Sequence, residues 1–125
     1  MKNVKFKAFI KDENKVVDVK ELSFKYDEVV YESGRYTEVR RFKDVELLQT
    51  TGLKDDFGNE LFEGSIFESR FSEIKYVVYW DDKLASFWIR GESKEHPLYT
   101  LTPFHPRILG NIYENPELLE EVKWN

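Results

Sequence analysis

The side chains best suited to chemistry in this sequence are two histidines. His96 and His105 stand nine positions apart, each directly before a proline, and no second histidine lies three or four positions away to complete a metal site on one helix face. The chain contains no cysteine, which excludes disulfides, thiolate nucleophiles and zinc sites built on cysteine. We therefore expect no metal, no cofactor and no catalytic residue.

Residues 55–60, Asp-Asp-Phe-Gly-Asn-Glu, superficially resemble a calcium-binding loop. An EF-hand loop needs oxygen ligands at alternate positions and a glutamate at the twelfth, between two helices, and this segment meets neither condition. The sequence also lacks a phosphate-binding glycine-rich loop and a Gly-x-Ser-x-Gly nucleophile motif. An enzyme that uses His96 or His105 with a carboxylate is the third-ranked interpretation, and the expectation is that the protein is not an enzyme.

Aromatic residues near the ends of predicted hairpins indicate protein binding instead. Trp80 and Trp88, together with Arg90, have the composition of an interaction hot spot, and Tyr99 is a further aromatic residue of this kind. Alternation along the predicted strand 85–90 places Trp88 and Arg90 on one face. Because aromatic residues in a small protein more often belong to the core, burial is the competing interpretation. The predicted partner-binding residues are Trp80, Trp88 and Arg90.

Basic residues on two predicted strands support an alternative, nucleic-acid binding. If the two strands were neighbours, their side chains would form a basic stripe with Phe9 and Tyr36 close by for base stacking. Lysines on an edge strand also prevent edge-to-edge aggregation, and the net charge of -5 counts against a polyanionic partner. The residues of this alternative site are Lys5, Lys7, Lys11, Arg35, Arg41 and Lys43.

Composition and patterning predict the elements that position these side chains. With 125 residues, 41% hydrophobic and 16% aromatic, the chain suits one folded domain or two very small ones. Alternation predicts a strand from Val4 to Ile10 and hairpins over 29–42 and 74–90, whereas the His-Pro pairs predict irregular stretches. Asn115 followed by proline and acidic residues predicts a short C-terminal helix.

The distribution of charge and the hydropathy pattern limit the possible domain organisation of the chain and its cellular compartment. Residues 1–62 carry 12 basic and 13 acidic side chains and residues 63–125 carry 7 and 11, an asymmetry that permits two sub-domains. Lysines interrupt the apolar residues at the N-terminus, and no apolar run approaches the ~18 residues that a membrane helix needs. We expect neither a signal peptide nor a membrane span, and a reducing cytoplasm fits the absence of cysteine best.

Three stretches of the sequence resemble the YopX family of phage and prophage proteins. They are Phe6–Phe9, Gln49–Asp55 with Gly58–Ile66, and Ile108–Leu119, in the family's order and spacing. The resemblance implies a small, mainly-β protein with no assigned activity, located in the cytoplasm of a bacterial host and able to form homo-oligomers. Where the family typically has an aspartate after the Glu-Gly pair, this chain has Ser65, which argues against an acidic site there.

The sequence therefore predicts a mainly-β protein with two parts. Residues 1–45 form an N-terminal antiparallel strand region or assembly arm, and residues 46–125 form a small SH3-like β-barrel with one short C-terminal helix. The predicted function is that of a non-enzymatic phage or prophage accessory protein. It self-assembles or binds a host or phage protein through exposed aromatic residues, with nucleic acid as the less favoured partner and no membrane.

Overall fold

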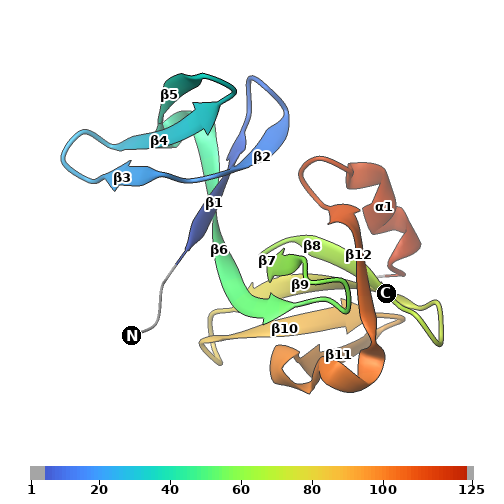
Figure 1. The fold of residues 1–125 in the computed structure, drawn as a ribbon. Coiled ribbons are helices and arrows are strands. Elements are labelled where there is room, and N and C mark those ends of the chain that lie inside the picture. Colours follow the sequence, from blue (N-terminus) through green and yellow to red (C-terminus); the bar gives the residue numbers. More distant parts are fainter. Residues whose placement is uncertain (1–4, 124–125) are drawn as a thin grey trace. The chain divides into compact units, whose positions relative to one another are not determined.

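The structure is a computed structural model that describes residues 5–123, and it consists mainly of antiparallel β-strands (Figure 1). The chain divides into two compact units, Met1–Thr50 and Thr51–Asn125, here called unit 1 and unit 2. The predicted boundary between residues 45 and 46 falls at the start of strand β6 (Val45–Lys54), which runs through the division. Within residues 5–123, no helix is both long enough and apolar enough to cross a membrane. The predicted mainly-β class is confirmed.

Unit 1 is made of two small antiparallel sheets. One has the strand order β2-β1-β6 and the other the order β3-β4-β5, and the 3-10 helix η1 (Phe42–Asp44) leads from the second sheet into β6. The predicted hairpin over 29–42 is confirmed as the pair β4–β5. The remaining strands are β1 (Phe6–Ile10), β2 (Lys15–Asp18), β3 (Glu21–Ser23), β4 (Glu28–Ser33) and β5 (Tyr36–Arg41).

The core of unit 1 follows from the alternation along its strands. Ala8 and Ile10 on β1 are fully buried, and so are Val29 and Tyr31 on β4. These four side chains form one cluster with Val45 at the start of β6, so apolar residues from both sheets meet in a single core. The strand predicted from Val4 is β1; Val4 itself lies outside the described residues.

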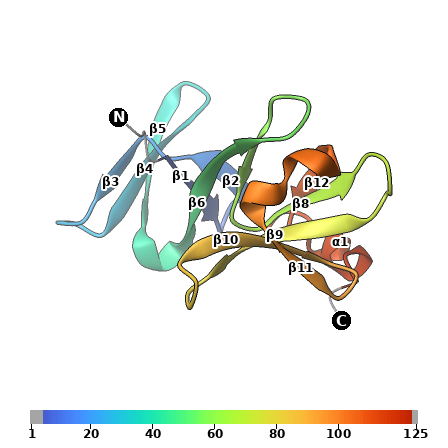
Figure 2. The ribbon, with the colours of Figure 1, turned by 90° about the horizontal axis from the view of Figure 1, so that it is seen from below.

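Unit 2 is organised around a five-stranded antiparallel sheet with the order β11-β10-β9-β8-β12, seen in Figures 1 and 2. The last residues of β6 are neighbours of the short strand β7 (Glu60–Phe62). Two 3-10 helices, η2 (Leu98–Thr100) and η3 (Thr102–Phe104), connect β11 to β12. The other elements are β8 (Ser65–Ser69), β9 (Lys75–Asp81), β10 (Ser86–Gly91), β11 (Lys94–Pro97), β12 (Pro106–Asn111) and α1 (Pro116–Glu121).

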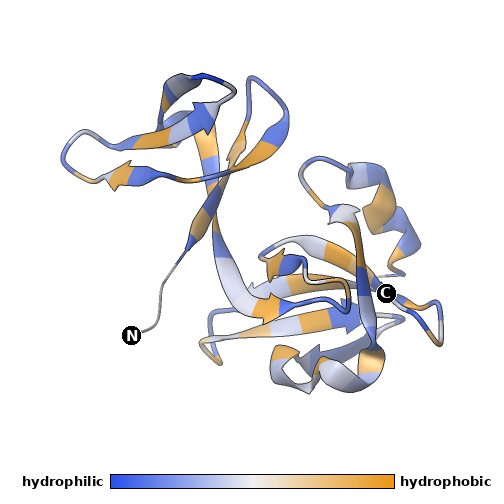
Figure 3. Cartoon of the chain, viewed as in Figure 1, coloured by the Kyte–Doolittle hydropathy of each residue, from blue (hydrophilic) through white to orange (hydrophobic). Residues whose placement is uncertain are grey.

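Apolar residues recur along the strands of this sheet, as the hydropathy colouring in Figure 3 shows, and buried ones lie on both of its faces. Residues of one parity, including Phe67, Tyr76 and Ile89, pack with Leu98 and Leu101 from the η2 region. Residues of the other parity, Ile66 and Val77, pack against Val122 after α1. The short C-terminal helix therefore covers one face of the sheet, and the η2 and η3 turns cover part of the other.

Two local predictions need correction. The segment around His96-Pro97 is strand β11 rather than an irregular stretch; it lies at the edge of the sheet, where a proline costs no ladder hydrogen bond. Asn115 precedes α1 as expected, but its side chain does not cap the helix. Its Oδ1 accepts a hydrogen bond from the Asn111 N–H at 3.2 Å instead, which closes the turn between β12 and α1.

Candidate functional site

The predicted partner-binding residues lie on opposite faces of the β9–β10 hairpin. Trp80 pairs in register with Phe87 and Trp88 with Tyr79, so the two tryptophans alternate in direction. Trp80 is 37% exposed, and its ring meets that of Phe87 edge to face at 5.0 Å. Trp88 is half-buried, shares its face with Arg90 and donates its indole N–H to the Ser86 hydroxyl at 3.0 Å. The three residues therefore do not form one surface.

Trp80 lies beside an apolar groove in unit 2. The groove has a volume of about 460 Å³ and is formed where β9 passes the segment that follows β12. Gly64 lies between the two, because its N–H donates to the Val78 carbonyl and its carbonyl accepts from the Ile112 N–H, both at 2.9 Å. The lining residues are Glu63, Gly64, Val77, Val78, Tyr79, Trp80, Ile112, Tyr113 and Leu119.

Among the described residues of unit 2, the most exposed aromatic side chains lie elsewhere, in two turns and in η2. Phe57, Phe71 and Tyr99 are 59%, 78% and 84% exposed, and we call these three residues the aromatic patch. Phe71 meets the His105 ring at 4.5 Å, and the Arg70 guanidinium lies over the Phe57 ring at 5.2 Å. The patch thus combines large apolar rings with a cation and an imidazole.

Asp56 connects the members of the aromatic patch. Its carboxylate pairs with Arg70 at 3.0 Å and with Nδ1 of His105 at 3.2 Å. Asp56 and Tyr99 also line a common cavity of about 210 Å³. The ion pairs therefore hold Arg70 and His105 next to one another, and with them the rings of Phe57 and Phe71, which stay open to solvent.

The neighbouring Asp55 has a structural role. Its side chain is buried, and Oδ1 accepts hydrogen bonds from the N–H groups of Phe57 at 3.0 Å and Asn59 at 2.8 Å, while Oδ2 accepts from the Ile108 N–H at 3.0 Å. Burial raises the pKa of Asp55, but the three backbone donors outweigh it and hold the pKa below its ordinary value. The acidic segment therefore folds the 55–59 turn and ties it to β12.

Ser65, which stands where the resemblance leads one to expect an aspartate, is also structural. It is fully buried, and its hydroxyl accepts a hydrogen bond from the Phe62 N–H at 2.9 Å. An aspartate can accept the same bond, since both residue types close turns in this way. The position therefore requires a short acceptor and needs no charge.

The first group of predicted nucleic-acid-binding residues lies on or beside β1. The ammonium group of Lys7 pairs with Asp18 at 2.6 Å, and that of Lys11 lies 3.8 Å from Glu46. Lys5 precedes the strand and is exposed. Much of the positive charge of this group is therefore balanced within unit 1.

The second group of basic residues belongs to a different sheet. Arg35 lies in the turn between β4 and β5, Arg41 at the far end of β5 and Lys43 in η1, and Arg41 faces Glu28 across the strand pair. Because β1 and β5 are not in the same sheet, the condition for a continuous basic stripe is not met. The two groups of residues do not line adjacent strands.

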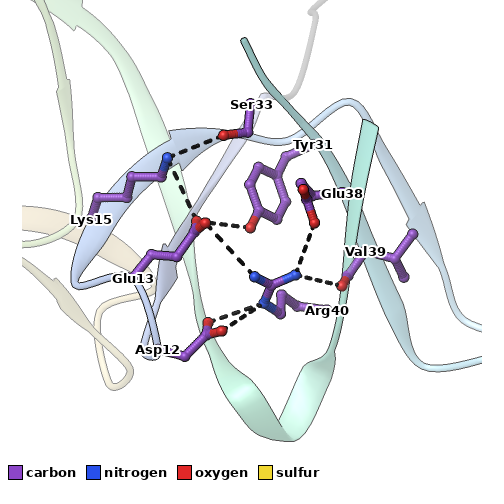
Figure 4. A network of polar contacts seen from close by, with 8 residues as sticks. All are labelled: Asp12, Glu13, Lys15, Tyr31, Ser33, Glu38, Val39 and Arg40. Atoms are coloured by element: carbon purple, nitrogen blue, oxygen red, sulfur yellow. Dashed lines mark hydrogen bonds and ion pairs between the residues drawn. The ribbon is translucent and has the colours of Figure 1, made fainter. Parts of the chain in front are cut away.

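A polar network in unit 1 surrounds Tyr31 (Figure 4). The Tyr31 hydroxyl donates to Glu13 at 2.9 Å, and Arg40 pairs with Asp12 at 3.0 Å and with Glu38 at 3.4 Å. Burial, reinforced by the bond to Glu13, raises the pKa of Tyr31 to about 12. The hydrogen bond from Arg40 lowers the pKa of Asp12. The network fastens the β1–β2 turn to β4 and β5.

The two histidines have separate surroundings. The His96 ring lies 5.1 Å from Phe104 and 6.2 Å from Tyr76, within an aromatic cluster, whereas His105 pairs with Asp56. Among residues 5–123, no group of three or more histidine, aspartate or glutamate side chains is placed to hold a metal ion.

Sequence reasoning did not single out Phe57, Phe71 or the Arg70–Asp56 pair. A signal was present: Phe57 and Phe71 each stand within a short polar turn, where an aromatic residue has no alternating strand pattern to carry it into the core. Tyr99 was considered, but its neighbours were not predictable because they come from turns more than 20 residues apart.

The chain belongs to the YopX family, since the family model described as "YopX protein" matches residues 5–120. Among solved structures, the crystal structure of protein EF1440 from Enterococcus faecalis is similar, with a TM-score of 0.64 and 22% sequence identity. The match covers 95% of this chain and 99% of that chain. At this level of identity the likeness shows the fold alone.

Curated relatives match over a shorter stretch. The thymidine kinases of Listeria monocytogenes serotype 4b (strain F2365) and Listeria innocua serovar 6a are 40% identical to this chain over 53 residues. The matched stretch covers 39% of this chain and 28% of each enzyme. The likeness is therefore local.

Proposed function

We propose that the chain is a non-enzymatic protein-binding protein, which docks onto a second copy of itself or a separate protein through exposed aromatic side chains. The aromatic patch of unit 2 supports the proposal most directly. Phe57, Phe71 and Tyr99 leave large apolar surfaces in water, at exposures of 59%, 78% and 84%, and burying them on a partner is favourable. Arginine and aromatic residues together are the types that dominate binding energy at protein interfaces.

The electrostatics of the patch suit recognition of protein. Asp56 holds Arg70 and His105 within 3.2 Å, so these groups are oriented before binding and lose little conformational freedom when a partner docks. Polar groups at the rim of an apolar contact favour one orientation of the partner over others. We propose that this rim gives the interaction its specificity.

The remaining parts of the proposal, the biological role, the compartment and the detailed fold of unit 2, are those that membership of the YopX family suggests. We propose a phage or prophage accessory role in the cytoplasm of a bacterial host, with unit 2 as a small SH3-like β-barrel. The five-stranded antiparallel sheet and the apolar cluster on one of its faces support that form. Docking requires no reaction, which agrees with the structural roles of Asp55 and Ser65 in the family motif.

Light scattering after size-exclusion chromatography, combined with co-capture by a tagged copy, tests the proposal. The test variant is Phe71→Ser/Tyr99→Ser, and the control is Leu84→Ser, which removes a side chain that is 58% exposed at the β9–β10 turn. We expect the wild type and the control to associate with themselves or with a host or phage protein, and the double variant to lose that association at least tenfold. Equal association by all three proteins would refute the role of the aromatic patch in binding. If the captured partner were released from the tagged copy only by nuclease or by salt, the result would indicate nucleic-acid binding instead.

A further inference from the structure

Strand β5 is the last strand of the unit 1 sheet with the order β3-β4-β5, and its outer edge is open. Among residues 5–123, β4 is the only strand that pairs with it. The strand is also accessible, because Val39 is 46% exposed and Tyr36, at its start, is 73% exposed. An accessible edge with unpaired backbone groups is a template for the addition of another strand.

The backbone groups at this open edge belong to every second residue of β5. In an antiparallel pair, residues alternate between bonding to the neighbouring strand and pointing away from it. The Val30 carbonyl, opposite Val39, accepts from the Lys20 N–H on the β3 side of β4 at 2.8 Å, so Val30 and Val39 do not exchange bonds. The N–H and carbonyl of Val39 therefore point to the open edge, and those of Thr37 and Arg41, two positions away on either side, do the same.

The Val39 carbonyl keeps capacity for a partner. It accepts a hydrogen bond from the Arg40 guanidinium at 2.9 Å, drawn as a dashed line in Figure 4. A backbone carbonyl has two lone pairs, so it can accept a second N–H as well. The edge therefore offers both donors and acceptors to an added strand.

The charges along β5 suit a second copy of the same strand in one register. Two copies that pair antiparallel about a two-fold axis can align five residues each, Tyr36–Arg40 or Thr37–Arg41, with these open groups facing one another. The first register is centred on Glu38 and sets two glutamates directly opposite, which is unfavourable. The second is centred on Val39 and sets Glu38 opposite Arg40 of the second copy, twice. Opposite charges therefore select the register centred on Val39.

We propose that two copies of this chain pair through β5, antiparallel and centred on Val39, so that their two β3-β4-β5 sheets become one continuous sheet. The two Val39 side chains cover each other, and Glu38 and Arg40, which lie 3.4 Å apart within one copy, face the same charges across the axis. Backbone hydrogen bonds supply affinity in this mode of recognition, and side chains supply specificity.

The pairing is expected to be weak. A single pair of short strands makes a smaller contact than the interfaces of about 1,200–2,000 Å² that hold stable complexes. The two copies should therefore join at high protein concentration and separate at the dilution of a chromatography column. β5 shares no residue with the aromatic patch, so this inference stands or falls independently of the proposed function.

Single-cysteine variants test the pairing and its register, because the natural sequence has no cysteine. Val39→Cys places the two thiols at the axis, where opposite Cα atoms lie about 5.5 Å apart. Thr37→Cys is the matched control on the same face, and its two thiols would lie four residues apart along the strand, roughly 13 Å or more. All variants also carry Phe71→Ser/Tyr99→Ser, so that the aromatic patch cannot account for the result.

The full chain at millimolar concentration is treated with a bis-maleimide crosslinker too short to span four residues of a strand. We expect Val39→Cys to form a crosslinked dimer at least tenfold faster than Thr37→Cys does. We also expect an equimolar mixture of Thr37→Cys and Arg41→Cys to form the mixed dimer, since these positions are opposite in the proposed register. No crosslinked dimer from Val39→Cys, or equal rates for Val39→Cys and Thr37→Cys, would overturn the inference.

A second pair of variants tests the role of charge in the same crosslinking assay. Glu38→Lys, added to Val39→Cys, sets two basic residues opposite each other, whereas Glu21→Lys makes the same change of charge on β3, at the far edge of the sheet. We expect the first to slow crosslinking at least fivefold and the second to change it less than twofold. Glu38→Gln serves if circular dichroism shows that Glu38→Lys does not fold. If the variant at position 38 that folds crosslinks as fast as Glu21→Lys does, the inference is wrong.

Discussion

The buried carboxylate of Asp55 provides a quantitative test of how the family motif works. The change Asp55→Ala removes the acceptor of three backbone N–H groups, those of Phe57, Asn59 and Ile108. A buried hydrogen bond of this kind contributes about 1 to 1.5 kcal/mol net, so the free energy of unfolding of unit 2 should fall by about 3 to 4 kcal/mol. Asp55→Asn keeps the acceptor for two of these groups but directs an amide N–H₂ at the third, and should cost about 2 kcal/mol.

Denaturant unfolding followed by tryptophan fluorescence measures this effect in the appropriate unit. All three tryptophans of the sequence fall within residues 51–125, so the signal reports unit 2. The control is Asp56→Ala, the adjacent residue, whose ion pairs lie near the surface and should contribute less than about 1 kcal/mol. Equal losses for Asp55→Ala and Asp56→Ala would refute the assignment of a structural role to Asp55.

The same carboxylate gives unit 2 a defined dependence on pH. Since the folded-state pKa of Asp55 is lowered from 3.8, its contribution to stability is present above that value and is lost as pH falls through the folded-state pKa. Wild-type unit 2 should therefore lose more stability than Asp55→Asn when the pH is taken from 5 to about 2. Parallel pH profiles for the two proteins would contradict the hydrogen-bonding account.

Three further predictions follow from other sites. Tyr31→Phe should lower the free energy of unfolding of unit 1 by about 1 to 2 kcal/mol, because it removes the hydrogen bond to Glu13. Since the pKa of Tyr31 is raised from 10.0 to about 12, the wild type should also lose stability between those two pH values, and the variant should lack this loss. Unfolding followed by circular dichroism measures both effects. Gly91→Ala should lower the free energy of unfolding by more than about 3 kcal/mol, because the added Cβ would overlap a backbone carbonyl of β9. In Gly58→Ala the added Cβ meets open space, so the loss should be about 1 to 2 kcal/mol. Denaturant unfolding measures both values. Lys5→Glu/Lys7→Glu should leave retention on immobilised DNA or RNA unchanged, and lost retention would revive the nucleic-acid alternative.

The sequence predicted those elements whose local pattern and packing agree. Strand β1 alternates apart from Phe9, and the β4–β5 hairpin has β-branched and aromatic residues on either side of a single glycine, so both were predictable. The strand around His96-Pro97 was missed because proline is a valid reason to expect irregular backbone, and an edge position is the exception. Whether two strands are neighbours is a property of topology, so the sequence could state the basic stripe of the alternative site only as a condition, and β1 and β5 lie in different sheets.

The candidate site was harder to predict than the fold. Alternation correctly placed Trp88 and Arg90 on one face, but no local rule relates Trp80 on β9 to that face before the register of the hairpin is known. The aromatic patch joins residues from three separate turns through Asp56, and such contacts depend on tertiary packing rather than on spacing in the sequence. The polar turns around Phe57 and Phe71 were a signal of their exposure, but residue type alone usually assigns an aromatic side chain to the core.

Site-specific photo-crosslinking in bacterial cells tests most directly whether the aromatic patch binds protein. Tyr99→benzoylphenylalanine places the reactive group on the side chain that is 84% exposed, and Leu84→benzoylphenylalanine places it on an exposed side chain outside the patch. We predict a protein adduct from position 99, at twice the 15.0 kDa chain mass or at the mass of this chain plus a partner, and none from position 84. The absence of an adduct from position 99, or the same adduct from both positions, would contradict the proposal.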